Sequence, residues 1–156
     1  KNIVDVAEDV VTSLVDYAES KEIHLIFDTN EEEIYVNLDD EFMQRIILNL
    51  ISNAIKFTKP DGTIEVILED KGEVVDLIVR DDGVGMEKTF IENAFNRYSM
   101  GKNNENASTK GTGIGLFVVK TLVEKQNGTI VIDSVINEGT TIKMTFKKEK
   151  MDYEEY

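Results

Sequence analysis

Cysteine is absent from this sequence of 156 residues. Its absence excludes disulfide bonds, thiolate metal sites and cysteine catalysis within the chain, and it is consistent with a reducing compartment. The sequence also lacks an apolar run long enough to span a membrane and an N-terminal secretory signal. The chain opens inside an amphipathic pattern, so we expect a piece of a longer protein. Any membrane anchor of that protein would lie upstream.

Basic residues are few: 17 lysines and arginines stand against 31 aspartates and glutamates, giving a formal net charge of −14. A field of that sign disfavours binding to nucleic acids and anionic membranes. It also opposes nucleotide binding, so any ATP site requires local cations and a metal. Part of the negative charge lies in residues 151–156, which we expect to be a frayed acidic tail rather than a functional segment.

The length and composition indicate one domain with a single hydrophobic core, which we place at residues 1–150. Apolar residues at helical spacing predict an amphipathic helix over residues 3–20, and a second helix runs from a cap at Asp39 or Asp40 to about Phe57. A third helix is expected at residues 114–125, after a long loop at residues 99–111. We expect strands at residues 23–27, 34–36, 63–68, 74–79, 129–135 and 140–146. The sum is an α+β fold: a two-layer sandwich with a mixed, mainly antiparallel sheet covered on one face by helices.

The second predicted helix carries a polar stripe opposite its apolar arc. Asn49 and Asn53 are i, i+4 neighbours in this stripe, and Lys56 stacks beyond them. A solvated surface would explain such a stripe, but asparagine is mildly unfavourable within a helix. The functional alternative gives the Asn53 amide oxygen a Mg²⁺ ion and Lys56 a phosphate, since magnesium prefers hard oxygen ligands.

Two glycine-rich segments follow. Residues 81–85 (DDGVG) come directly after a predicted strand, where an aspartate can accept a hydrogen bond from an exocyclic amine. Taken alone, this segment is more often a plain turn. Residues 111–116 (GTGIGL) are expected to open a helix, where free backbone N–H groups favour phosphates. Between them lies FNRY at residues 95–98, in which Arg97 is either a surface charge or a stabiliser of the transferring phosphoryl group.

Together these segments resemble the histidine kinase branch of the superfamily of gyrase, heat-shock chaperone and mismatch-repair ATPases. Residues 49–58 (NLISNAIKFT) resemble its N box, and residues 95–98 its F box. Residues 81–85 and 111–116 resemble its two glycine boxes. The four motifs follow the family's order, and the resemblance covers essentially the whole chain. It implies the Bergerat fold and a Mg·ATP site in a cytoplasmic domain.

The resemblance also implies roles for individual residues. Asn53 coordinates Mg²⁺ with support from Asn49, and Lys56 contacts phosphate. Asp81 binds the adenine amine, and Arg97 acts near the γ-phosphate. A lid at about residues 97–111 closes over the triphosphate. The remaining nucleotide-binding residues implied are Phe57, Gly83, Gly85, Gly111, Thr112, Gly113, Gly115 and Leu116.

Asn49 distinguishes between activities of the superfamily. Hydrolysing members carry a glutamate at this position as the general base for water, and an amide cannot take a proton. A neutral histidine acceptor needs little base assistance. Asn49 therefore favours phosphoryl transfer to histidine over two rivals: a hydrolytic ATPase, and a serine kinase of the anti-sigma type. A pseudokinase that binds nucleotide or a partner without transfer remains a further alternative.

The acceptor itself is not expected in this chain. The only histidine, His24, lies in a predicted strand rather than in the long helix that the family uses, so we interpret it as structural or superficial. The resemblance implies that the acceptor is on a helical dimerisation and phosphoacceptor domain, with a response regulator downstream. Because kinase dimers usually form through that helical domain, we expect this domain alone to be monomeric.

Overall fold

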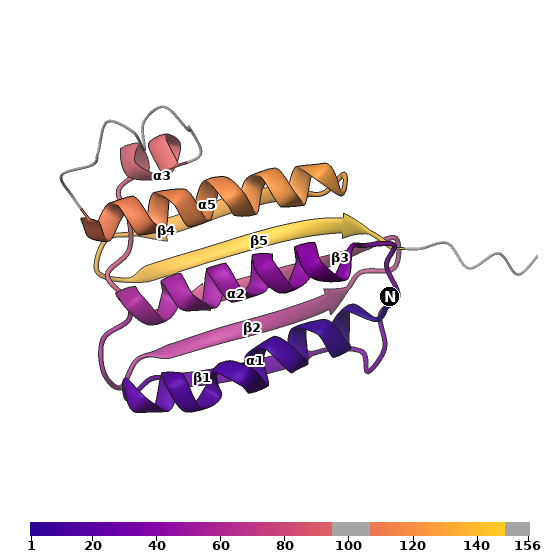
Figure 1. The fold of residues 1–156 in the computed structure, drawn as a ribbon, viewed down its shortest axis with the longest axis horizontal. Coiled ribbons are helices and arrows are strands. Elements are labelled where there is room, and N and C mark those ends of the chain that lie inside the picture. Colours follow the sequence, from indigo (N-terminus) through magenta and orange to yellow (C-terminus); the bar gives the residue numbers. More distant parts are fainter. Residues whose placement is uncertain (95–106, 149–156) are drawn as a thin grey trace, which may run out of the picture.

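The computed structural model describes residues 1–94 and 107–148, which form one sheet and four helices within those ranges (Figure 1). Its helices and strands follow the predicted order, apart from the differences at residues 34–36, in α3 and at the start of α5 that are described below. In chain order they are α1 (Ile3–Ser20), β1 (His24–Thr29), α2 (Asp40–Phe57), β2 (Thr63–Asp70), β3 (Val74–Asp81), α3 (Lys88–Ala94), α5 (Ala107–Lys125), β4 (Thr129–Val135) and β5 (Gly139–Lys147).

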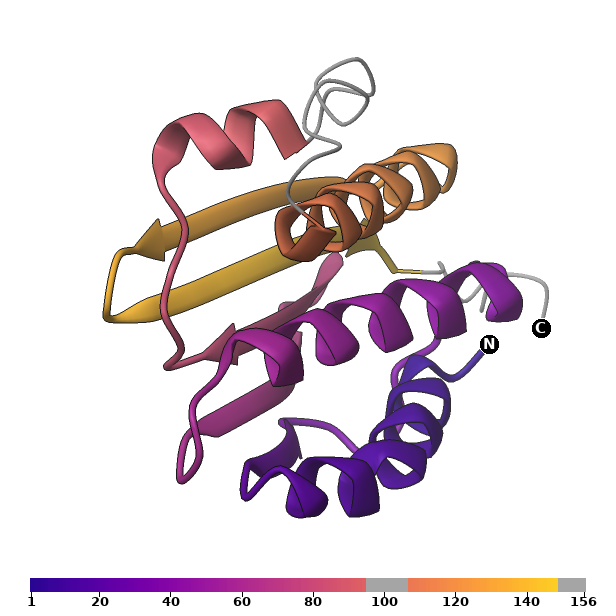
Figure 2. The same cartoon turned by 60° about the vertical axis from the view of Figure 1, so that its left-hand side comes forward.

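The five strands form a single mixed sheet in the order β1-β2-β3-β5-β4. Strand β1 pairs with β2 in parallel, and the other three pairings are antiparallel. Helices α1, α2 and α5 run side by side over one face of this sheet, as Figures 1 and 2 show. The predicted two-layer α/β sandwich is therefore confirmed.

The core lies between the sheet and the three long helices. Alternate residues of the central strands point into it, because successive side chains of a strand face opposite sides of the sheet. On α2, buried residues recur every three or four positions, which places them on one stripe of the helix. The strand residues of this core are Ile64, Val66, Leu68, Val75, Leu77, Val79, Ile142, Met144 and Phe146.

Both N-terminal helices begin at a side-chain cap. The Asn2 side chain accepts a hydrogen bond from the Val4 backbone N–H at 3.2 Å, and Asp39 accepts one from Phe42 at 3.0 Å. Helix α2 ends at Phe57 because Thr58 turns extended, two residues before Pro60. The chain then reverses into β2, so the last turn of α2 lies at the same end of the sheet as the end of β3.

Gln126 holds α2 and α5 together at the opposite end of the sheet. Its side chain accepts a hydrogen bond from the Asp39 backbone N–H at 2.7 Å and donates one to the Leu122 carbonyl at 3.2 Å. The first residue before α2 is thereby tied to the last turn of α5. The two helices stay adjacent along their length and bring Asn53 next to Gly115.

Three expectations are corrected by the structure. The strand expected at residues 34–36 is wrong: Tyr35 forms an isolated bridge with Asn2, and the segment pairs with the start of α1 rather than with the sheet. Helix α3 was not predicted, because its seven residues are too few to establish a helical period in the sequence. The loop expected at residues 99–111 is wrong for residues 107–111, which belong to α5.

The longer α5 also changes the place of the second glycine segment. Residues 111–116 were expected to open the helix, but they lie inside it, after its first turn. Each glycine in a helix costs about 1 kcal/mol relative to alanine, so the sequence pattern favoured a later start. Tertiary packing of the buried turns from Leu116 to Val123 overrides that cost. The backbone N–H groups of this segment are therefore not those of a helix N-terminus.

Candidate nucleotide site

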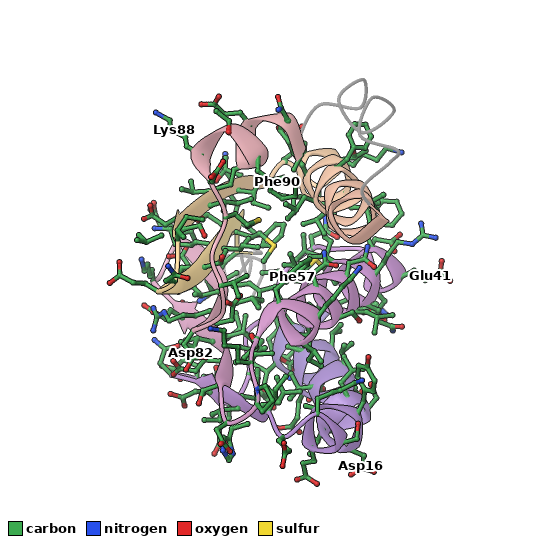
Figure 3. All side chains as sticks on the ribbon, turned by 90° about the vertical axis from the view of Figure 1, so that its left-hand side faces the viewer. Asp16, Glu41, Phe57, Asp82, Lys88 and Phe90 are labelled. Atoms are coloured by element: carbon green, nitrogen blue, oxygen red, sulfur yellow. The ribbon has the colours of Figure 1, made fainter. Side chains whose placement is uncertain are left out.

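A pocket opens where the last turn of α2 meets the end of β3. Its walls come from four parts of the chain: α2, the end of β3 with the turn that follows it, α5 and the start of β5. Figure 3 looks at this end of the molecule, with Phe57 near its centre and Phe90 of α3 above it. The lining is mostly apolar and consists of Leu50, Asn53, Ala54, Phe57, Val79, Asp81, Gly85, Met86, Leu116, Thr140 and Ile142.

Asp81 is the one acidic residue of this lining. Its carboxylate accepts a hydrogen bond from the Gly83 backbone N–H at 2.9 Å and another from the backbone of Thr140. Burial raises the pKa of Asp81 above its usual value, against the lowering effect of these two hydrogen bonds, and the neighbouring charge of Asp82 adds to the increase. A half-buried carboxylate that only accepts hydrogen bonds is suited to an exocyclic amine at the end of an apolar pocket.

The glycine turn after β3 is packed against protein backbone on two sides. A Cβ atom on Gly83 would collide with the Phe57 carbonyl oxygen, and one on Gly85 would collide with the Val135 carbonyl oxygen. Gly85 also has a φ of +74°, which side chains rarely allow. Gly85 lines the pocket, whereas Gly83 does not. The turn requires glycine at both positions because it packs closely against the end of α2 and the end of β4.

Asn53 and Gly115 bring the N-box segment and the second glycine segment into contact. A Cβ atom on Gly115 would lie 2.7 Å from the Asn53 side-chain nitrogen. That nitrogen is buried and has no hydrogen-bond partner among the described residues. An unpartnered amide nitrogen in the pocket lining is available to donate a hydrogen bond to a ligand, because buried polar groups are otherwise paired. Leu116, which follows Gly115, is 1% exposed and forms part of the pocket wall.

The donor set fits a magnesium ion that is carried by a nucleotide. Within residues 1–94 and 107–148 there is no group of three or more histidine, aspartate or glutamate side chains able to hold a metal by itself. Magnesium is commonly bound through one or two protein oxygens together with substrate phosphates and water. The Asn53 amide oxygen is a hard ligand of that kind, so Asn53 can hold the ion only together with phosphates.

Asn49 and Lys56 lie on α2 beside the pocket but not in its lining. Asn49 is half-buried one turn before Asn53, and Lys56 is exposed. The Lys56 ammonium nitrogen is 5.7 Å from the centroid of the Phe57 ring, which does line the pocket. Both residues are thus within one helical turn of a pocket residue, on the side of α2 that the predicted polar stripe occupies.

Several predicted site residues cannot be compared with this geometry. Arg97 lies outside the described residues, as does the acidic tail, and so does the part of the expected lid before Ala107. Gly111, Thr112 and Gly113 belong to α5 by their backbone.

Some pocket residues were not found by sequence reasoning. Thr140 and Met86 have no motif of their own, although Thr140 follows Gly139 at the start of a predicted strand. The apolar residues Leu50, Ala54, Val79 and Ile142 looked like ordinary core residues, and only their meeting at one end of the sheet gives them a second role.

No helix of the described residues has both the length and the apolar character needed to cross a membrane.

Comparison with known proteins agrees with this geometry. Residues 38–150 match the family model described as histidine kinase-, DNA gyrase B-, and HSP90-like ATPase. The sensor histidine kinase YvrG of Bacillus subtilis (strain 168) is 43% identical over 123 residues, covering 79% of this chain and 21% of that protein. The sensor histidine kinase WalK of the same organism is 32% identical over 139 residues, covering 85% of this chain and 23% of that protein. The chain thus spans about a fifth of the length of these relatives.

Solved structures share the fold. The catalytic domain of the histidine kinase ThkA, in a nucleotide-free form, superposes with a TM-score of 0.82 at 24% identity, covering 94% of this chain and 95% of that one. The match extends over α1 and β1, which precede the residues that the family model covers. The pocket between α2, α5 and the sheet is therefore part of a fold that known kinase domains share.

Proposed function

This chain belongs to the family of histidine kinase-, DNA gyrase B- and HSP90-like ATPases, as the ATP-binding catalytic domain of a sensor histidine kinase. We propose that it transfers the γ-phosphoryl group of Mg·ATP to a histidine on a separate helical domain. The observation that carries the proposal is the pocket that joins Asp81 to the Asn53–Gly115 contact. The Asp81 carboxylate suits a base that carries an amine, and the Asn53 amide suits a metal-bound phosphate chain.

In this proposal the adenine lies between the apolar walls of the pocket and donates its amine hydrogen to Asp81. Asp81 then distinguishes adenine from guanine, because guanine presents a carbonyl oxygen where adenine presents the amine, and two acceptors repel each other. Phe57 and Leu116 supply apolar surface from α2 and α5. Burial of the base gives binding energy, and the carboxylate gives orientation.

The phosphates then extend past Asn53. Magnesium bound at the Asn53 amide oxygen would neutralise charge on the phosphate oxygens. Lys56 contacts a phosphate as a point charge, and Arg97 stabilises charge on the transferring group. In the reaction, a bond forms between the acceptor histidine nitrogen and the γ-phosphorus, the bond between that phosphorus and the β–γ bridging oxygen breaks, and ADP leaves. The chain supplies positioning and charge neutralisation.

Asn49 supports transfer to histidine rather than hydrolysis. It lies one turn before Asn53 on α2, where hydrolysing relatives carry a glutamate as general base. An amide there cannot remove a proton from water, and the histidine acceptor does not require it. His24 is not the acceptor in this proposal, since it lies exposed on the edge strand β1 and is not part of the pocket lining.

The partners follow from this assignment. The acceptor domain belongs to the same kinase and forms the dimer, so this domain alone is a monomer. A response regulator takes the phosphoryl group from the histidine. The domain acts on the cytoplasmic side, where ATP is available, whether or not the parent protein has a membrane anchor.

The test has two stages. Calorimetric titration with ATP and with a non-hydrolysable analogue, each with and without Mg²⁺, measures nucleotide binding by this chain. Addition of the helical acceptor domain and radiolabelled ATP then measures transfer. We expect saturable, magnesium-dependent binding, little turnover alone, and acid-labile label on the acceptor domain. No binding at millimolar ATP, or fast hydrolysis without an acceptor, would contradict the proposal.

A further inference from the structure

The hydroxyl group of Ser134 lies at a junction of backbone and side-chain hydrogen bonds beside the pocket. Ser134 is half-buried on β4, the edge strand, and is not part of the pocket lining. Its Oγ accepts a hydrogen bond from the Met86 backbone N–H at 2.7 Å. It lies 2.7 Å from the Thr140 Oγ1 and 3.1 Å from the Gly139 carbonyl oxygen, to which it can donate.

The hydrogen-bonding capacity of one hydroxyl accounts for all three contacts. A serine hydroxyl has one hydrogen to donate and two lone pairs to accept with. If Ser134 donates to the Gly139 carbonyl, it accepts from both Met86 and Thr140, and every donor and acceptor position is used. If it donates to Thr140 instead, the Thr140 hydroxyl hydrogen is released towards the pocket. In both arrangements the Met86 N–H keeps its partner.

Every partner of Ser134 belongs to the nucleotide pocket or touches it. Met86 and Thr140 line the pocket directly, and the backbone of Thr140 hydrogen-bonds to the Asp81 carboxylate. A Cβ atom on Gly139 would collide with the Asp81 carbonyl oxygen, so Gly139 lies directly against Asp81. Ser134 therefore joins the two segments, the glycine turn and the start of β5, that hold Asp81 between them.

Among the described residues, one other hydrogen bond joins the glycine turn to the β4–β5 connection. The Asn137 backbone N–H donates to the Val84 carbonyl at 2.8 Å. This bond lies at the exposed tip of the connection, where Val84, Val135 and Ile136 are all solvent-exposed. The hydrogen bond between Ser134 and Met86 is partly buried, and Met86 lines the pocket, so this bond holds the part of the turn that faces the pocket.

We infer that Ser134 is a positioning residue for the nucleotide base. Its hydroxyl holds both the Met86 end of the glycine turn and the Thr140 hydroxyl in place, so that the base can bind beside Asp81. This inference rests on the proposed function, because it needs a nucleotide in the pocket. Strand β4 provides no residue of the pocket lining, yet through Ser134 it would contribute to the affinity for nucleotide.

Substitution at Ser134 separates this role from a general contribution to stability. Ser134→Ala removes the hydroxyl and leaves the Met86 N–H without its partner, whereas Ser134→Thr keeps a hydroxyl on a strand, where threonine is favoured. The matched control is Thr145→Val, which removes another partly buried hydroxyl on the same sheet. The Thr145 hydroxyl donates to the Asp76 carboxylate at 2.6 Å, and neither residue is part of the pocket lining.

The experiment is calorimetric titration of the chain and these variants with ATP and with ADP, together with thermal unfolding of each protein without ligand. We expect Ser134→Ala to weaken ATP and ADP binding by the same factor, about five- to tenfold, because the base is common to both ligands. Ser134→Thr should recover most of the affinity. Thr145→Val should lower the unfolding temperature and leave both affinities within about twofold of wild type.

Other outcomes would overturn the inference. Wild-type affinity in Ser134→Ala would show that the hydroxyl does not position the base. Equal losses of affinity in Ser134→Ala and Thr145→Val would indicate a general effect of stability. Loss of cooperative unfolding in Ser134→Ala would make the hydroxyl a requirement of the fold. Failure of the wild-type chain to bind ATP is a different result, because it would contradict the proposed function itself.

Discussion

The side-chain nitrogen of Asn53 lies 2.7 Å from the point where a Cβ atom on Gly115 would be, so helices α2 and α5 are in close contact at these two residues. The contact cannot be predicted from the sequence, in which 61 residues lie between Asn53 and Gly115. The glycine leaves space for the amide, whose nitrogen is buried without a hydrogen-bond partner among the described residues. The contact therefore connects the proposed metal ligand to the helix that follows the second glycine segment.

Substitution of Gly115 by alanine should reduce nucleotide affinity without unfolding the domain. The added Cβ would displace the Asn53 amide, while alanine favours the helix by about 1 kcal/mol relative to glycine. We expect ATP affinity to fall by about tenfold or more, with an unfolding temperature within a few degrees of wild type. Calorimetric titration and circular dichroism measure the two effects.

Glu124→Ala is the matched control for this substitution, because Glu124 is exposed on the same helix and also gains helix propensity. It should leave ATP binding unchanged. Wild-type affinity in Gly115→Ala would show that the position of Asn53 at this contact does not matter for nucleotide binding.

Replacement of Asp81 by asparagine should have opposite effects on binding and on stability. The amide can still accept the Gly83 hydrogen bond, but its NH₂ group can face the adenine amine, so ATP binding should become undetectable at about 1 mM. The apo domain should become more stable at pH 7, since a partly buried charge is removed. Asp82→Asn removes one charge at the next, exposed position, and it should preserve binding.

The raised pKa of Asp81 gives a sign for the pH dependence of stability. In the pH range between the unfolded value, near 3.8, and the higher folded value, the folded state holds the proton more tightly than the unfolded state. The stability contributed by Asp81 is present below that range and is lost as pH rises through it. Urea unfolding of wild type and Asp81→Asn from pH 3.5 to 7 should show the stabilising effect of the substitution growing with pH. A constant difference would contradict this.

Asp76 should show the opposite pH dependence. This carboxylate is buried on β3; burial alone would raise its pKa, but hydrogen bonds from Lys71 at 2.6 Å and from Thr145 outweigh that effect and lower it. Its contribution to stability is present above about pH 3.8 and is lost as pH falls through the lower folded value. Asp76→Asn should therefore destabilise the domain at pH 7 and reduce the acid-side loss of stability, as followed by urea unfolding.

Asp133, which is exposed on β4, provides the control for this effect. Asp133→Asn should leave both the stability at pH 7 and its acid dependence close to wild type. An unchanged stability in Asp76→Asn would mean that the Lys71 and Thr145 contacts contribute nothing net to folding.

A glutamate at position 49 should introduce hydrolysis. Asn49 is half-buried on α2 one turn before Asn53, so a carboxylate there could take a proton from water near the γ-phosphate. We expect Asn49→Glu to increase phosphate release in the absence of an acceptor by about tenfold or more. Asn49→Gln has the same side-chain length without basicity and should show no increase. Equal rates in the two variants would exclude this position as the determinant of transfer over hydrolysis.

The expectations from sequence were accurate where residues within or next to a helix or strand determine its ends. Helices α1 and α2 have the predicted ends, because Asn2 and Asp39 cap them and Pro60 follows the second. The sequence failed where a partner far along the chain decides the outcome. Residues 34–36 have the composition of a strand, but the start of α1 takes their hydrogen bonds.

The same distinction applies to the site. Asp81 and Asn53 were singled out because four motifs together resemble one family, whereas each motif alone also has an ordinary explanation. Thr140 and Ser134 could not be recognised. Their relevance depends on the sheet order β3-β5-β4, which brings the start of β5 and the end of β4 beside the glycine turn.

The sequence by itself determined the two-layer fold and the identity of the polar groups, because alternation, helical periodicity, caps and glycine turns act over a few residues. The tertiary structure decided where the second glycine segment lies, which apolar residues form a pocket rather than plain core, and which hydroxyl bonds to the glycine turn at Met86. Those outcomes depend on close approaches between segments distant in the chain, such as Asn53 with Gly115 and Ser134 with Met86. Packing at 3 Å between such segments is fixed by the whole core and cannot be deduced from any one of them.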